Sequence, residues 1–154
     1  MGAIEERLEE LGLELPPSTR PIANFVLVVR TGSLAFVSGH GPTGGDGRPV
    51  YTGSVASEVP VEDAYAAARL TILNCLRTLH DELGTLDRVR RIVKLLGMVR
   101  SDPGFTQQPQ VINGASDLLV ELFGDRGRHA RSAVGMAALP HGIPVEIELV
   151  AEVE

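Results

Sequence analysis

The C-terminal stretch from Ile143 to Glu154 alternates between apolar and acidic side chains almost without a break. The apolar set is Ile143, Val145, Ile147, Leu149, Ala151 and Val153, and the acidic set is Glu146, Glu148, Glu152 and Glu154. Val150 is the one apolar residue among the acidic positions. A period of two is typical of a strand that buries one face and turns the other toward polar surroundings. The chain is therefore expected to build a sheet with one face in a core.

A second strand is predicted just before this one, over residues 129–136. A turn containing Pro140, Gly142 and Pro144 joins the two. The lone Arg131 of the earlier strand stands between small residues that leave room for a ligand. Its planar guanidinium can bind a carboxylate through two parallel hydrogen bonds. A surface role, a structural ion pair and a contact between subunits are the alternatives for Arg131.

Helical periodicity appears in three segments, residues 3–11, 61–83 and about 108–123. The middle one follows Pro60 and ends at Gly84, which are typical residues for a helix start and stop. Its apolar stripe consists of Ala64, Ala68, Ile72, Cys75, Leu79 and Leu83. Remaining strands are predicted at residues 24–29 and 34–38, which form a hairpin, at 51–55 and at 89–99.

This order predicts an α+β two-layer domain, in which two long helices cover one face of a mixed sheet. Residues 1–20 are expected to form an N-terminal helix and linker, and residues 21–154 a single domain. A chain of 154 residues can bury a full core without disulfides or metal.

Other common chemical motifs give weak signals. Gly39-x-Gly41-x-x-Gly44 matches a dinucleotide-binding pattern, but the prolines and glycines that follow forbid the helix that such a site needs. The four histidines have no zinc-site spacing, and Cys75 has no cysteine partner. Cys75 lies on the apolar stripe of its helix, where an inert buried thiol is expected. We therefore expect neither a metal nor an organic cofactor.

The charge balance bears on partners and location. A net charge of −6 disfavours nucleic acid, because phosphate binding needs a basic face. The N-terminal segment is acidic and carries no secretion signal, and no apolar run approaches the roughly 20 residues that span a bilayer. We expect a cytoplasmic protein with no membrane partner.

Several short motifs resemble the Rid family, the reactive-intermediate deaminases also called YjgF-like or endoribonuclease L-PSP proteins. The C-terminal motifs are Ala130-Arg131-Ser132, Ala138-Leu139-Pro140 and residues 145–151, and the upstream ones are Val37-Ser38-Gly39, Leu73-Asn74, residues 83–89 and Val111-Ile112-Asn113. The resemblance covers about residues 21–152. It implies a chorismate-mutase-like fold and a homotrimer with a cleft between each pair of subunits.

The resemblance also implies roles for individual residues. Arg131 would bind the substrate carboxylate, and Glu146 would hold or orient the attacking water. Ser38, Gly39 and Asn113 would line or support the same cleft. The implied reaction is hydrolysis of 2-aminoacrylate and related 2-imino acids to a 2-keto acid and ammonia, without a cofactor.

Two positions depart from the family pattern. Phe25 stands near the first strand, where many deaminating members carry Tyr, and Ala133 stands two residues after the arginine, where Cys is frequent. These departures favour a second interpretation, a small-molecule binding or regulatory trimer without turnover. The third is RNA cleavage or inhibition of translation, which the acidic balance disfavours.

Overall fold

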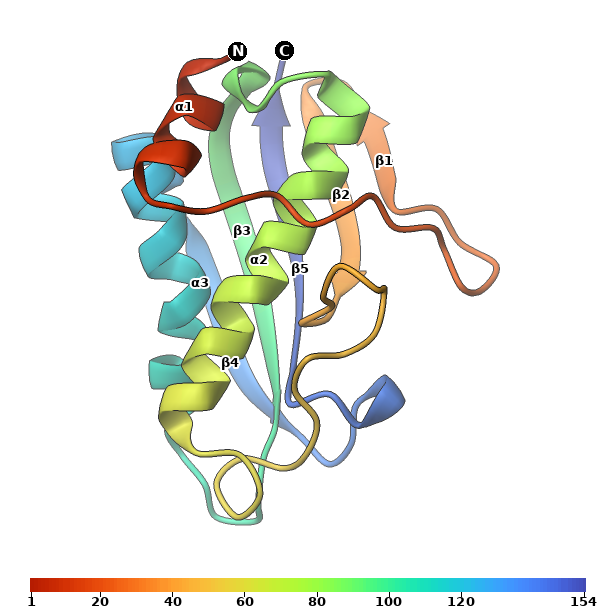
Figure 1. Ribbon diagram of the computed structural model, residues 1–154, viewed down its shortest axis with the longest axis vertical. Coiled ribbons are helices and arrows are strands. Elements are labelled where there is room, and N and C mark those ends of the chain that lie inside the picture. Colours follow the sequence, from red (N-terminus) through yellow and green to blue (C-terminus); the bar gives the residue numbers. More distant parts are fainter.

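The computed structural model describes residues 1–154 as two layers, a five-stranded sheet and a layer of helices (Figure 1). The strands are β1 (Val28–Thr31), β2 (Leu34–His40), β3 (Val89–Arg100), β4 (Ala130–Met136) and β5 (Val145–Val153). The helices are α1 (Ala3–Glu10), α2 (Val61–Leu83) and α3 (Gln108–Phe123), with short 3-10 turns at Leu86–Arg88, Gly124–Gly127 and Pro140–Gly142. The predicted α+β architecture, with two long helices on one face of a mixed sheet, is confirmed.

The strand order is β1-β2-β5-β3-β4, so the alternating C-terminal strand lies in the middle of the sheet. It pairs antiparallel with both β2 and β3, while β4 pairs parallel with β3 at the sheet edge. The last two strands in sequence are thus not neighbours, because β3 lies between them. Alternate residues of β5 from Val145 to Val153 are buried, as the sequence pattern predicted.

The two long helices begin and end where the sequence predicted. Helix α2 starts after Pro60, has two acidic residues in its first turn, and ends at Gly84. Gly84 has a φ of 81°, a left-handed conformation that glycine adopts without strain. Gly114 on α3 lies so close to the backbone oxygen of Tyr65 on α2 that a methyl group would overlap it. The two helices therefore pack at the distance that a glycine permits.

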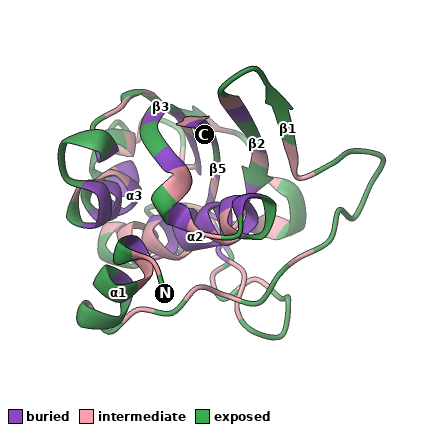
Figure 2. Cartoon of the chain, turned by 90° about the horizontal axis from the view of Figure 1, so that it is seen from above, coloured by how far each residue is buried: buried purple, intermediate pink, exposed green.

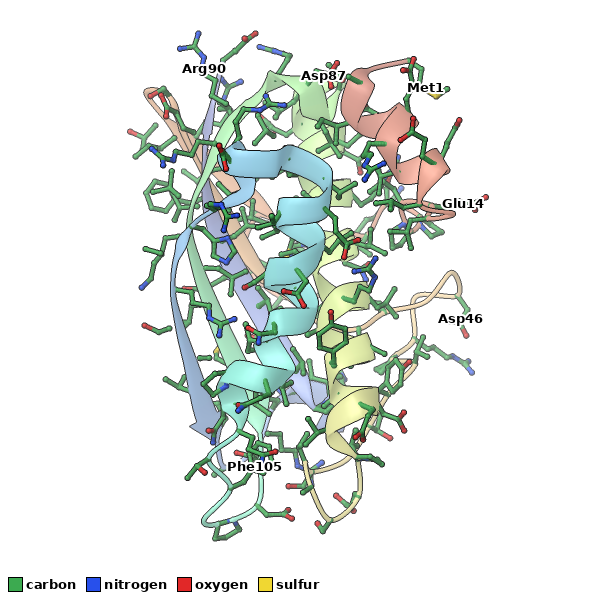
Figure 3. All side chains as sticks on the ribbon, turned by 90° about the vertical axis from the view of Figure 1, so that its left-hand side faces the viewer. Met1, Glu14, Asp46, Asp87, Arg90 and Phe105 are labelled. Atoms are coloured by element: carbon green, nitrogen blue, oxygen red, sulfur yellow. The ribbon has the colours of Figure 1, made fainter.

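The N-terminal helix is part of the same core. Ile4 and Leu8 are buried in it. The Asp87 carboxylate accepts hydrogen bonds from the first backbone N–H groups of α1, at 2.8 and 2.9 Å. Glu5 accepts one from the backbone N–H of Leu86 at 2.7 Å. Figure 3 shows the side chains of this end of the molecule, with Met1 and Asp87 labelled.

Two predicted strands need correction. The first strand begins at Val28 instead of residue 24, because residues 24–27 form part of a loop. Residues 51–55 form no strand, since this segment makes only isolated bridges from Val55 to Val59 and Ser101. Its Gly53 has a φ of 123°, which regular strand geometry does not accommodate.

No helix covers the second face of the sheet, called here the open face (Figure 2). Exposed apolar side chains on it include Val29, Phe36 and Val134. A hollow in this face is lined by Ser38, Lys94, Leu96, Ser132, Glu148 and Val150, together with Val29 and Phe36. None of the helices is long and apolar enough to cross a membrane.

Candidate functional site

Arg131 lies on the edge strand β4 and turns its side chain toward the helix layer. Its register partner on β3 is the buried Leu95, whose side chain also faces the helices. The Arg131 guanidinium donates one hydrogen bond to Ser116 Oγ at 3.0 Å and one to the backbone oxygen of Pro109 at 3.2 Å. No carboxylate of the chain forms an ion pair with it. Its charge is thus held in place but uncompensated.

Asn113 lies on the same face of α3 as the two groups that hold Arg131. It follows Pro109 by four residues and precedes Ser116 by three, the spacings that place side chains one above another on a helix. The Asn113 side chain is partly exposed and makes no hydrogen bond within the chain. It is therefore free to bind a ligand beside Arg131.

His129 completes this group, although no sequence motif predicted its place there. Its Nε2 lies 2.9 Å from Ser116 Oγ, and its Nδ1 lies 2.7 Å from the backbone oxygen of Gly127. Burial lowers the pKa of His129, the hydrogen bond to Gly127 opposes this change, and the charge of Arg131 adds to it. A serine inside a helix and a histidine before a strand form no motif, so only the fold reveals that they meet.

Glu146 lies on β5 and projects from the open face of the sheet. Burial raises the pKa of its carboxyl group, and the neighbouring charge of Glu148 raises it further. The backbone of Gly39 borders the carboxylate closely, since a Cβ atom at that position would lie 2.6 Å from Glu146 Oε2. A glycine at residue 39 thus creates the space that Glu146 occupies.

Ser38 and Gly39 lie at an irregularity where the pairing of β2 with β5 shifts between Val37 and His40. The Ser38 hydroxyl donates to the backbone oxygen of Val26 at 2.7 Å and so holds the preceding loop against β2. Phe25, the residue before Val26 in that loop, is 42% exposed. Ser38, Gly39, Glu146 and Phe25 therefore belong to one region of the open-face side.

The chain presents two separate groups of candidate residues. The first consists of Arg131, Asn113, Ser116 and His129, and the second of Ser38, Gly39, Glu146 and Phe25. Strand β3 lies between β4 and β5, and its Leu95 pairs with Arg131 on one side and with Leu149 on the other. Glu146 lies three residues before Leu149 on β5. Strand spacing and rise put the Cα atoms of Arg131 and Glu146 on the order of 14 Å apart, with the side chains on opposite faces. One chain cannot bring both to a small ligand.

The one thiol of the chain does not contribute to either group. Cys75 is fully buried on α2, and its Sγ lies 3.6 Å from the backbone oxygen of Ile147. Burial raises the pKa of this thiol well above its ordinary value. Ala133, two residues after Arg131, faces the same side of β4 without offering a polar group.

Comparison with known proteins agrees with this fold. The sequence matches the profile of the family described as YjgF/chorismate mutase-like, putative endoribonuclease, over residues 5–153. Protein TCP17 of Trypanosoma cruzi is 42% identical over 152 residues, which cover 98% of this chain and 94% of that protein.

Solved structures extend the likeness. The protein Atu1372 from Agrobacterium tumefaciens, of unknown function, is 43% identical with a TM-score of 0.90, covering 98% of this chain and 92% of that one. A putative endoribonuclease from Shewanella oneidensis MR-1 is 33% identical with a TM-score of 0.95, covering 99% and 100%. YyfA of Yersinia pestis, from the Rid protein family, is 25% identical with a TM-score of 0.64, covering 90% and 94%. The first two matches include nearly the whole chain, so α1 is not peculiar to it.

Proposed function

Because the chain belongs to the YjgF/chorismate mutase-like family, we propose that it is a deaminase that hydrolyses small 2-imino acids, such as the imine form of 2-aminoacrylate, to 2-keto acids and ammonia. One observation carries this proposal. The Arg131 guanidinium is fixed by two hydrogen bonds yet has no carboxylate partner within the chain. A cation prepared in this way is suited to bind the carboxylate of a small substrate.

The proposal includes assembly into a homotrimer, with each site formed between two subunits. Arg131 and Asn113 would come from one subunit, and Ser38, Gly39 and Glu146 from its neighbour. The separation of the two groups within one chain supports this arrangement. The exposed apolar side chains of the open face support it too, because such surfaces are usually covered by a partner.

In the proposed reaction, Arg131 fixes the carboxylate and thereby orients the adjacent C=N carbon. Glu146 takes a proton from a water molecule as the water oxygen bonds to that carbon, and the imine nitrogen takes up a proton from solvent as its π bond to carbon breaks. Glu146 then returns its proton to the amine nitrogen of the carbinolamine. The C–N bond breaks as the hydroxyl loses its proton to solvent and becomes the carbonyl, so that ammonia leaves and the 2-keto acid remains. The raised pKa of the Glu146 carboxyl group makes its carboxylate a stronger base than an exposed glutamate.

A second candidate function is a binding or regulatory trimer that uses the same residues without turnover. Phe25 favours it, because a partly exposed phenyl ring offers no hydroxyl to a reacting water or imine. RNA cleavage, the activity in the family's description, is disfavoured by the net charge of −6.

Imine hydrolysis tests the proposal directly. A threonine dehydratase generates 2-iminobutyrate in place, and the decay of the imine is followed with the protein present. We expect wild type to accelerate decay, and Arg131→Ala to abolish the effect. Arg131→Lys is expected to be nearly as damaging, because a point charge does not replace the two-pronged guanidinium.

Arg128→Ala is the matched control, since Arg128 is an exposed arginine three residues away that pairs only with Asp125. Its rate is expected to equal that of wild type. No acceleration by wild type would refute the deaminase proposal. Tight binding of 2-oxobutyrate by calorimetry in that case would support the binding module instead.

A further inference from the structure

Arg131 is the last member of a series of hydrogen bonds that runs through Ser116 and His129, two residues with no part in the proposed reaction. Its guanidinium donates to Ser116 Oγ at 3.0 Å, and Ser116 Oγ lies 2.9 Å from Nε2 of His129. Nδ1 of the same imidazole lies 2.7 Å from the backbone oxygen of Gly127. We propose that Ser116 and His129 are positioning residues, which orient Arg131 toward the substrate carboxylate through this series of hydrogen bonds. The inference rests on the proposed function of Arg131.

The direction of every hydrogen bond in the series follows from its two ends. A backbone carbonyl can only accept, so Nδ1 of His129 must carry the proton that binds Gly127. In the neutral imidazole Nε2 is then an acceptor, and the Ser116 hydroxyl must donate to it. Its oxygen therefore offers its lone pairs to Arg131. The arginine, which can only donate, is the correct partner at the other end.

Both ends of the series are fixed to rigid backbone. Gly127 is buried against α3, and a methyl group at this residue would overlap the backbone oxygen of Leu119. The carbonyl that accepts from His129 is thus held at one place. At the other end, the guanidinium has a second fixed acceptor in the backbone oxygen of Pro109, at 3.2 Å. Two acceptors on one helix define the orientation of the guanidinium plane.

This arrangement addresses a general problem of arginine as a ligand-binding group. The side chain has many rotamers, and fixing one of them during binding costs free energy. A guanidinium that is oriented beforehand loses less freedom when the carboxylate arrives. The burial that lowers the pKa of His129 also keeps the imidazole neutral, so that no second positive charge repels Arg131.

A spectroscopic measurement tests this series of hydrogen bonds independently of activity. Long-range ¹⁵N–¹H correlation spectra of His129 at neutral pH are expected to show a protonated Nδ1 and a bare, hydrogen-bonded Nε2. Ser116→Ala should shift the Nε2 resonance toward the value of a free acceptor, while Ser116→Thr, which keeps the hydroxyl, should not. A protonated Nε2 in wild type would overturn the proposed direction of the series.

Kinetics test the positioning role. Ser116→Ala is expected to raise KM for the imino acid about tenfold, as expected when a hydrogen bond to a charged group is lost. It should change kcat by less than about twofold, because the bound carboxylate itself then holds the guanidinium in place. Ser116→Thr should restore KM.

Ser18→Ala is the control for the loss of a hydroxyl, because Ser18 also accepts a hydrogen bond from an arginine, Arg77, but on an exposed surface. An unchanged KM in Ser116→Ala would overturn the positioning role if Arg131→Ala abolishes activity. Full activity of Arg131→Ala would instead refute the proposed function itself, and the spectra would still decide whether the series of hydrogen bonds exists.

Discussion

At the scale of single residues, two histidines are bonded in the same way. In each, Nδ1 lies next to the backbone oxygen of the residue two positions earlier, and Nε2 lies next to a hydroxyl group on a long helix. These partners are Gly127 and Ser116 for His129, and Ser38 and Thr78 for His40. Because a backbone carbonyl can only accept, Nδ1 carries the proton in both rings. In His40 this joins β2, at the irregularity that carries the candidate residues, to α2. Burial favours the neutral imidazole at both places.

This preference for the neutral form predicts how stability depends on pH. Burial lowers the pKa of both imidazoles, so the unfolded chain, in which the pKa is about 6.5, binds protons first as the pH falls. The free energy of unfolding should thus decline below about pH 6.5 and continue to fall until the folded protein titrates. Urea unfolding at pH 7 and at pH 5.5 measures this difference in the free energy of unfolding.

His40→Gln is expected to weaken this decline, because the buried titrating group is gone. Any overall loss of stability in the variant does not affect the comparison, which uses the difference between the two pH values. A decline equal to that of wild type would show that His40 does not contribute.

Gly39 provides the second prediction at this scale. Gly39→Ala is expected to lower kcat for imine hydrolysis at least about tenfold, because the added methyl group displaces the Glu146 carboxylate that orients the water. The free energy of unfolding should change by less than about 1 kcal/mol, since the end of a side chain can move aside.

Gly45→Ala is the matched control, because it lies in the following loop and a methyl group there meets no atom within 4 Å. Its activity is expected to equal that of wild type. Normal kcat in Gly39→Ala would mean that Glu146 has no role in the reaction.

At the scale of elements, local signals predicted the helices and the alternating strand correctly. The bounds of α2 follow from Pro60 at its start and Gly84 at its end, and its buried face follows from the apolar stripe. The alternation of apolar and acidic residues likewise predicts β5. The position of β3 between β4 and β5 could not be predicted, because strand order depends on which long-range pairings bury the most apolar surface. Residues 51–55 have the composition of a strand, but Gly53 turns the chain away.

The candidate site divides in the same way. Arg131 and Glu146 were predicted from the family resemblance. Ser116 and His129 lie 15 and 2 residues from Arg131 in the sequence, and only the fold brings Ser116 to Arg131 and His129 to Ser116. The sequence also gave no indication that Arg131 and Glu146 face opposite sides of the sheet. The first outcome depends on the packing of α3 against β4, and the second on the register in which β4 and β5 pair with β3.

Packing between the long helices can be tested through Gly114. Gly114→Ala is expected to destabilise the fold by about 1–3 kcal/mol, because the methyl group would force α3 away from the backbone of α2. Urea unfolding measures this change, again with Gly45→Ala as the control. Since α3 also carries the acceptors of Arg131, KM for the imino acid should rise in parallel. A stability equal to that of wild type would show that the helix pair can separate freely.

At the scale of the whole molecule, the two-layer fold leaves one face of the sheet uncovered and places half of the candidate site on each side of it. The helix side offers a fixed cation at the sheet edge, and the open-face side offers a carboxylate beside a glycine. A second copy of the chain would bring the complementary half and cover exposed side chains such as Val29 and Phe36. This is the central claim of the proposed function.

Subunit mixing tests that claim most directly. Arg131→Ala and Glu146→Gln are each expected to be inactive in imine hydrolysis. The two variants are mixed in equal amounts, unfolded and refolded, so that each subunit of a trimer has a random neighbour. A site is intact only where a Glu146→Gln subunit supplies Arg131 and an Arg131→Ala subunit supplies Glu146, which is expected at about one interface in four. About a quarter of the wild-type activity should return. Activity that stays at the level of the separate variants, in mixed trimers verified by mass, would contradict a site shared between subunits.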